Sequence, residues 1–138
     1  MSVLPPEIQL ALSELLNLLQ SADNVQRTQA EEKLQNDWTQ PRPGVLLMGL
    51  AEQIQGAIDP PTRSYAAVLF RRIATRTRND PQTNRTMELF LTIPPTERGA
   101  IQQKLLQCLQ TENAADVRNK TGDAVAEIAR QYTEEGIA

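Results

Sequence analysis

The 138-residue sequence contains no histidine and only one cysteine, Cys108. Histidine supplies most general bases and zinc ligands in proteins, and cysteine supplies thiolate nucleophiles and further ligands. Leu105 and Leu109 place Cys108 on the apolar side of an expected helix, which indicates a core residue. A lone cysteine can form no internal disulfide. The composition therefore predicts no catalytic residues, no metal site and no bound cofactor.

The remaining chemical groups do not predict a reaction centre either. Glu31-Glu32 and Glu134-Glu135 are adjacent in sequence, so each pair diverges around a helix instead of acting together as acid and base. The glycines at 44, 49 and 56 lack the spacing of a phosphate-binding loop. We therefore expect a protein that works by binding partners and is not an enzyme.

Aromatic residues and long apolar runs are scarce as well. Aromatics make up 4% of the chain, against a hydrophobic fraction of 40%. Strands favour aromatic and β-branched residues, whereas the abundant Leu, Ala and Gln favour helices. No run approaches the roughly 18 apolar residues of a membrane span, and the first residues do not resemble a secretory signal. These features predict an all-α protein in the cytosol or nucleus.

Positive charge is in the minority. The formal net charge is −3, which disfavours a nucleic acid or an anionic membrane as the partner of the whole chain. The most basic stretch comprises Arg71, Arg72, Arg76 and Arg78, with Arg63 further upstream. These cations either complement the dipole at a helix end or form an exposed ridge for a protein partner. A nucleic-acid patch is less favoured because no aromatics are interleaved for base stacking.

Apolar residues recur at helical spacing along most of the chain. The first helix is expected over about 5–20, and proline or glycine separates the helical stretches that follow. From about Thr77 to Asn84 the sequence is polar, and a short helix is expected around 87–93 before Pro94 and Pro95. No segment alternates cleanly enough to predict a strand.

An internal repeat links three of the expected helices. An arginine is followed by a small residue three positions later and by an apolar residue four positions beyond that. The motif occurs as Arg27-Ala30-Leu34, Arg63-Ala66-Phe70 and Arg118-Thr121-Val125. The first two arginines are 36 residues apart and the third lies 55 further on, which fits one unit with an insertion of about 19 residues. The arginine is expected to satisfy carbonyls or acids of the neighbouring repeat.

This pattern is similar to that of HEAT repeats, in which an A helix and a B helix form an antiparallel hairpin that cannot bury both apolar stripes alone. The predicted fold is an all-α solenoid of about three HEAT repeats in a right-handed superhelical stack, as a fragment of a longer array. The expected units are repeat one (5–39), repeat two (42–78), an insert with a short helix (79–93) and repeat three (95–134).

Several strings, in this order and spacing, carry a more specific resemblance over essentially the whole chain. They are Ser21-Ala22-Asp23-Asn24-Val25-Gln26-Arg27, Ala67-Val68-Leu69-Phe70-Arg71-Arg72-Ile73, Phe90-Leu91-Thr92-Ile93, Leu109-Gln110-Thr111-Glu112 and Ala126-Glu127-Ile128-Ala129. Together they resemble the N-terminal HEAT repeats of the importin-β (karyopherin-β) family of nuclear transport receptors, most closely its beta-3 subtype in fungi.

The resemblance implies a receptor that shuttles between cytoplasm and nucleus through the nuclear pore. Its first B helices would line a concave surface and bind the small GTPase Ran in the GTP state, releasing cargo held elsewhere on the solenoid. Import cargo and nucleoporins would be further partners of the full-length receptor. The matching B-helix positions, each of which could instead be ordinary solvated surface, are Thr28, Glu32, Gln35, Arg71, Thr75, Arg78, Asn119, Lys120 and Asp123.

The ending departs from the family, because a further repeat opening with a Trp-Pro element would be expected after 132–138. We therefore expect a piece of a longer protein, with an apolar end face that favours self-association. Two other functions remain open at this point. One is a HEAT-repeat scaffold subunit of a multiprotein complex without a nucleotide-state switch, and the other is a helical accessory domain of an enzyme.

Overall fold

The computed structural model describes residues 4–136, within which six α-helices account for most of the chain. Shorter elements are a π-helical continuation of α2 (η1), a two-stranded hairpin and a 3-10 helix (η2). The elements are α1 (Pro6–Leu19), α2 (Asn24–Lys33), η1 (Leu34–Thr39), α3 (Pro43–Gly56), α4 (Pro60–Ala74), β1 (Thr77–Asn79), β2 (Thr86–Glu88), η2 (Leu89–Thr92), α5 (Pro95–Thr111) and α6 (Ala115–Glu134).

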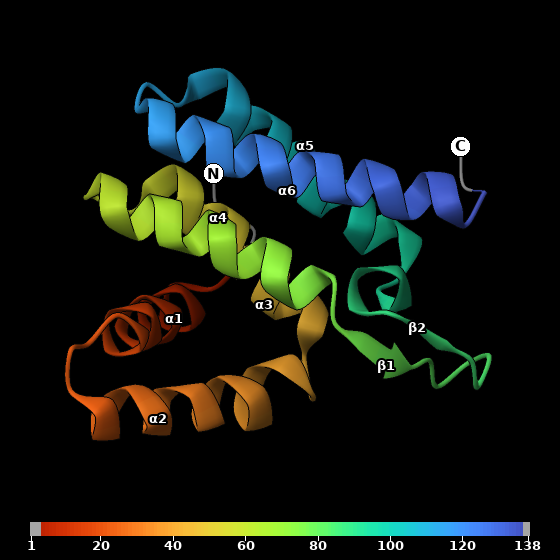
Figure 1. Cartoon of the computed structure of the whole chain (residues 1–138), viewed down its shortest axis with the longest axis horizontal. Helices are drawn as coiled ribbons and strands as arrows, with labels where there is room; N and C mark the ends of the chain where they lie inside the picture. The colour runs from red at the N-terminus through yellow and green to blue at the C-terminus, as the bar shows by residue number, and fades with distance from the viewer. Residues whose placement is uncertain (1–3, 137–138) are drawn as a thin grey trace.

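The helices pack as three consecutive pairs, α1 with α2, α3 with α4, and α5 with α6. Neighbouring pairs stack through α1 against α3, α3 against α5, and α4 against α6. Figure 1 shows α6, α4 and α2 following one another across the molecule, with the hairpin at one end of α4. The predicted stack of paired helices is thereby confirmed.

Local sequence explains where several helices begin. Proline occupies the first turn of α1, α3, α4 and α5, where its fixed φ suits the helix and its missing N–H is no loss. The Asp23 carboxylate accepts hydrogen bonds from the N–H groups of Val25 and Gln26 at 2.8 and 3.2 Å, and Asp59 caps α4 at Thr62 in the same way. These caps define sharp turns within the first two helix pairs.

The core runs continuously through the three pairs. Trp38, Phe70 and Phe90 are at most 1% exposed and lie among leucines and isoleucines from α1, α3, α4, α5 and α6. Cys108 is also buried, and its thiol donates to the carbonyl of Ala51 at 3.4 Å. Burial raises the pKa of this thiol to about 11, so it stays protonated at neutral pH. The expectation that Cys108 is a core residue is confirmed.

Gly49 permits close contact between the first two pairs. A Cβ atom at this position of α3 would lie 2.5 Å from Cδ2 of Leu12 on α1. Glycine in a helix interior costs about 0.5–1 kcal/mol relative to alanine, and the close approach of α1 offsets that cost. The glycine is therefore a packing residue.

The sequence predicted no β-strands, and that prediction is wrong. β1 and β2 pair antiparallel, with Arg78 opposite Met87, between hydrogen bonds from Leu89 N to Arg76 O (2.6 Å) and from Asp80 N to Arg85 O (2.7 Å). Three-residue strands are too short to show an alternating apolar pattern, and backbone hydrogen bonds together with the turn define this pair instead. The short helix expected around 87–93 is a 3-10 helix confined to Leu89–Thr92.

The turn of the hairpin is built on Asp80. Its carboxylate accepts hydrogen bonds from the N–H of Gln82 at 3.3 Å and from the hydroxyl of Thr83 at 2.9 Å. Asn84 follows with a φ of 58°, a left-handed conformation that asparagine tolerates better than most residues. Over residues 4–136, no helix combines the length and the apolar character needed to cross a membrane.

Candidate partner-binding surface

We use the name B layer for the second helices of the three pairs, α2, α4 and α6, which follow one another across the molecule. Within the B layer, α4 packs closely against α6, whereas a pocket of about 170 Å³ separates α4 from α2. The outer face of this layer is the surface to which the sequence assigned partner binding. Its geometry follows from the two junctions on either side of α4.

The motif arginines have the same local role in all three pairs. Each donates to the carbonyl six residues upstream, in the loop between the two helices: Arg27 to Ser21 (3.1 Å), Arg63 to Ala57 (3.1 Å) and Arg118 to Glu112 (3.4 Å). Each arginine thereby closes the loop of its own pair. The expectation that the arginines reach a carbonyl or an acid of the neighbouring repeat is therefore wrong for Arg27 and Arg118, and it is confirmed only for Arg63, through Glu112.

Arg63 alone among the three also reaches the next pair, through a double hydrogen bond to Glu112. Its Nε and Nη2 donate to the two carboxylate oxygens at 3.0 and 2.9 Å, and the Glu112 side chain is only 7% exposed. The hydrogen bond from Arg63 lowers the pKa of Glu112, and this effect exceeds the opposing effect of burial. The bond to Glu112 raises the pKa of Arg63 in turn. This ion pair links the second helix pair to the third.

Further polar contacts cross from α4 to α6. The buried amide of Gln131 donates to the carbonyl of Ala74 at 3.0 Å, and the Ser64 hydroxyl donates to the Asp116 carboxylate at 2.6 Å. These bonds lie near opposite ends of α4, so they hold the two helices together along most of their length.

The predicted site residues do not all occupy one surface. Thr28, Glu32, Arg71, Asn119 and Asp123 are exposed on the B helices. In contrast, Gln35, Thr75, Arg78 and Lys120 are half-buried. The exposed members are the ones directly available to a partner.

Three of the half-buried residues have structural contacts, and in the first of them the Thr75 hydroxyl donates to the carbonyl of Arg72 at 3.0 Å. Gln35 lies in the π-helical continuation of α2 and accepts a hydrogen bond from Arg76 on the α4 side at 3.0 Å. Arg78 lies in β1 opposite Met87, beyond the end of α4. The sequence analysis had placed it on the second B helix, and that placement is wrong because α4 ends at Ala74.

A larger groove on this layer is lined by residues that the sequence analysis did not select, apart from Arg72, which belonged to its basic stretch. It has a volume of about 610 Å³ and lies between the N-terminal parts of α4 and α6, next to the end of α1. We call it the α4 groove, and its lining residues are Gln20, Pro60, Pro61, Ser64, Tyr65, Val68, Arg72, Ala114, Asp116 and Val117. Tyr65 and Arg72 also line the pocket between α2 and α4, so they form the ridge between the two hollows.

Sequence reasoning could have found this ridge. Tyr65, Val68 and Arg72 recur at helical spacing on α4, adjacent to the stripe of Ala66, Leu69 and Ile73 that enters the core. A second apolar and aromatic stripe beside the buried one indicates a wider or additional contact surface. The signal is weak because partly exposed apolar residues are common on protein surfaces.

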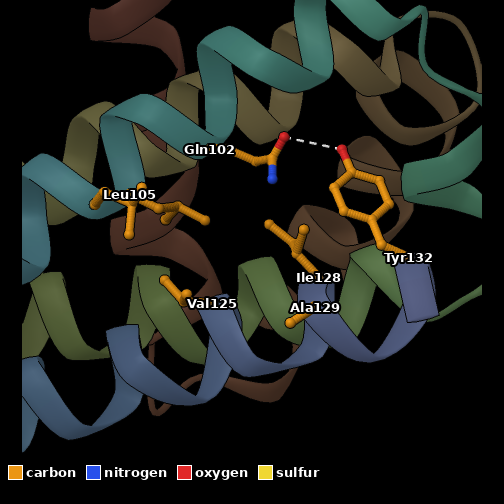
Figure 2. A pocket seen from close by; sticks show the side chains of 7 residues that line it. Gln102, Leu105, Val125, Ile128, Ala129 and Tyr132 are labelled. Atoms are coloured by element: carbon orange, nitrogen blue, oxygen red, sulfur yellow. Dashed lines mark hydrogen bonds between the residues drawn. The ribbon is translucent and has the colours of Figure 1, made fainter. Parts of the chain in front are cut away.

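A third hollow, of about 150 Å³, lies between α5 and α6 at the end of the stack. Figure 2 shows Leu105 of α5 and Val125, Ile128 and Ala129 of α6 around it, with the Tyr132 hydroxyl donating to Gln102 at 2.9 Å. Its lining is mainly apolar. This is the end face for which the sequence predicted self-association.

Arg130 anchors the hairpin to α6. Its guanidinium contacts the carboxylates of Glu88 at the end of β2 and of Glu127 and Glu134 on α6. Burial raises the pKa of Glu127, but the hydrogen bonds from Arg130 and Gln131 and the charges of Arg130 and Arg71 together outweigh it, so the pKa is lowered. Within residues 4–136, no group of three or more potential metal ligands gathers in a site.

Comparison with known proteins identifies the relatives of this fold. No known family profile matches the chain. Importin subunit beta-3 of Saccharomyces cerevisiae is 32% identical over 134 residues, which cover 94% of this chain and 12% of that protein. The solved structure of Kap121p superposes on 90% of the chain, at 31% identity and a TM-score of 0.72. The structure of Kap121p bound to RanGTP also matches, at 31% identity and a TM-score of 0.67.

The chain spans about an eighth of the length of these relatives. The match nevertheless covers nearly all of the chain, and identity and fold agree. The matched relatives belong to a family of transport receptors that are not enzymes. Over most of its length, the chain is a homologue of one segment of the HEAT-repeat solenoid of importin subunit beta-3, a member of the karyopherin-β family of nuclear transport receptors.

Proposed function

We propose that this chain is the N-terminal part of a nuclear import receptor and that its B layer binds Ran in the GTP state. The observation that carries the proposal is the similarity, at 31% identity over 90% of the chain, to Kap121p in a structure bound to RanGTP. Ran binding would release cargo held elsewhere on the full-length solenoid. The receptor would shuttle between cytoplasm and nucleus.

The same comparison suggests further partners of the intact receptor. Kap121p has also been solved bound to Nup53p and to Ste12p. By homology, nucleoporins and import cargo are the partner classes of the full-length protein. We divide the segment into repeat one (5–39), repeat two (42–78), an insert (79–93) and repeat three (95–134), and the three repeats supply α2, α4 and α6 to the B layer.

The residues proposed to contact Ran are the exposed B-helix positions and their immediate neighbours. Arg71, Asn119 and Asp123 are exposed on the two closely packed helices α4 and α6, and Thr28 and Glu32 are exposed on α2. Gln35, Thr75, Arg78 and Lys120 belong to the same proposal with smaller contact areas, since each is half-buried. No residue of this set needs to perform chemistry, because the nucleotide belongs to the partner.

Selectivity for the GTP state would follow from differential binding. The γ-phosphate and its magnesium ion order the switch loops of a GTPase, and a rigid surface binds the ordered form more tightly. The polar contacts between α4 and α6 suit this role because they keep the spacing of the two helices constant. Because the cargo is held elsewhere on the solenoid, Ran-GTP can weaken cargo binding only through a change of receptor state. By linkage, Ran-GTP must then bind one state more tightly and cargo the other.

The test is calorimetric titration of the chain with Ran loaded with a non-hydrolysable GTP analogue and, in parallel, with GDP, at moderate salt. We expect binding to the GTP form and at least about tenfold weaker binding to the GDP form, which corresponds to about 1.4 kcal/mol. Equal affinity for both forms would support a scaffold without a nucleotide switch. Absence of binding to either form would contradict the proposal for this segment.

A further inference from the structure

Two side chains on the outer face of α4 lack partners within the described part of the chain. The hydroxyl of half-buried Tyr65 and the guanidinium of exposed Arg72 make no hydrogen bond or ion pair with any of residues 4–136. Burial raises the pKa of Tyr65, so its hydroxyl stays protonated and can donate. Tyrosine and arginine, together with tryptophan, are the residue types enriched in the energetic centres of protein interfaces.

The α4 groove between this ridge and α6 has an apolar interior. Pro61 and Val68 of α4 face Val117 of α6 across it, and Ala114 lies at the start of α6. Its volume of about 610 Å³ is within the range of sites that accept several side-chain-sized groups. Asp116 lines one end, where its carboxylate is already bound by the hydroxyl of Ser64 at 2.6 Å.

The charge of the groove changes along α4. Asp116 lies beside Ser64, whereas Arg72 lies eight residues further along the helix, about 12 Å away at 1.5 Å per residue. Arg71 and Arg76 flank Arg72, and none of these three arginines forms a salt bridge with another of the described residues. The C-terminal half of α4 is therefore a locally cationic surface in a chain whose net charge is −3.

We propose that the α4 groove binds an amphipathic segment of a protein partner, which inserts an apolar side chain between Val68 and Val117 and places a carboxylate on Arg72. The Tyr65 hydroxyl supplies a further hydrogen bond at the same ridge. The proposal rests on the proposed function in one respect, namely that the B layer is the side that meets a partner. It adds the chemistry of the contact and the two residues at its centre.

A nucleic acid fits this surface less well than an acidic protein segment. The acidic residues Asp116 and Glu31 line the groove and its neighbouring pocket, where they would repel phosphates. Tyr65 is the only aromatic residue among those that line either hollow, so successive bases could not stack. An apolar interior with an arginine at one end is typical of a peptide groove.

The experiment compares the wild-type chain with Tyr65→Ala, Arg72→Glu and the control Arg85→Glu. Arg85 is exposed in the turn between β1 and β2, outside the B layer, and lines neither hollow, so its substitution makes the same change of charge away from the groove. Circular dichroism and thermal unfolding establish that each variant is folded. The probes are Ran loaded with a GTP analogue, a helical peptide with leucine on one face and glutamate on the other, its lysine counterpart, and single-stranded DNA.

We expect the glutamate peptide to bind the wild-type chain and the lysine peptide and DNA not to. Arg72→Glu should weaken glutamate-peptide and Ran binding at least about tenfold, Tyr65→Ala several-fold, and Arg85→Glu less than about twofold. If Tyr65→Ala and Arg72→Glu left Ran binding unaffected, the α4 groove would not be the contact site, and the proposed function would remain intact. Peptide binding without Ran binding would support the groove and count against Ran as the partner.

The remaining outcomes are also decisive. Failure of both Ran and the glutamate peptide to bind would overturn the groove as well as the proposed function. Equal binding of the lysine peptide or of DNA would overturn the acidic chemistry assigned to the partner.

Discussion

The two junctions of this stack are held together in different ways. At the first, between α1–α2 and α3–α4, Leu12 packs so closely on Gly49 that no larger residue fits without a shift. At the second, between α3–α4 and α5–α6, polar bonds cross the interface as well, including the Arg63–Glu112 ion pair and the bond from Gln131 to Ala74. The first junction thus depends mainly on apolar packing, and the second adds directional contacts.

This difference explains where the B layer is tight and where it is open. Directional bonds define the relative position of α4 and α6. In contrast, a pocket separates α2 from α4, and a hydrogen bond of 3.0 Å from Arg76 to Gln35 spans it. Apolar packing tolerates small shifts better than hydrogen bonds do, because it has little directionality. We infer that the second junction is a rigid platform and that the first can adjust to a partner.

The largest expected effect comes from removing apolar contact at the first junction. Leu12 is fully buried, so Leu12→Ala should lower the free energy of unfolding by about 2–5 kcal/mol through lost transfer energy and the cavity left behind. Leu10→Ala, on the exposed side of the same helix at 62% exposure, is the control and should change it by less than about 0.5 kcal/mol. Urea unfolding measures both, and similar small effects would contradict a packing-dependent first junction.

The next largest effect is expected at the ion pair of the second junction. Arg63→Ala leaves the nearly buried Glu112 carboxylate without its main donor and should cost about 1–3 kcal/mol. Arg76→Ala, which removes one exposed hydrogen bond at the first junction, should cost at most about 1 kcal/mol. If Arg76→Ala were the more destabilising of the two in chemical denaturation, the contrast between the junctions would be wrong.

The same ion pair predicts a pH dependence. The pKa of Glu112 is lowered from its ordinary value of 4.5 in the folded chain, so its stabilising contribution is complete above that value and is lost as the pH falls through the lower, folded-state pKa. The stability difference between wild type and Arg63→Ala should therefore shrink below about pH 4.5. Thermal unfolding of both proteins between neutral and acidic pH measures it, and a constant difference throughout would exclude this linkage.

The smallest effect concerns the end face between α5 and α6. Its apolar hollow and Leu106, which is 42% exposed, should allow weak self-association at high concentration. Leu106→Gln should reduce it without loss of folding, whereas Leu18→Gln, also 42% exposed but on α1, should not. Sedimentation equilibrium over a range of concentrations compares them, and a strictly monomeric wild-type chain would rule out association through this face.

Much of the fold could be predicted from the sequence because its signals are local. Helical spacing of leucines, prolines in the first turns and the arginine motif predicted a stack of paired helices, and the structure has three such pairs. The hairpin was missed because its stability comes from backbone pairing and from the Asp80 turn, neither of which leaves an apolar pattern. Cys108 was predicted correctly because its leucine neighbours already indicate burial.

The candidate surface was harder to predict. Selecting B-helix residues by position found exposed side chains such as Arg71 and Asp123 but passed over Tyr65, and it named Arg72 only as part of the basic stretch. Whether a half-buried residue lines a groove depends on how far apart two helices lie, and that distance is set by contacts remote in sequence. The bond between Gln131 and Ala74, 57 residues apart, is one such contact.

The central claim, that the B layer is the partner-binding face, is tested most directly by hydrogen–deuterium exchange of the chain with and without Ran carrying a GTP analogue. The account predicts added protection in α2, α4 and α6, strongest along the exposed face of α4, with α1, α3 and α5 unchanged. Protection confined to α1, α3 and α5 would contradict it, as would exchange that Ran leaves unaltered throughout the chain.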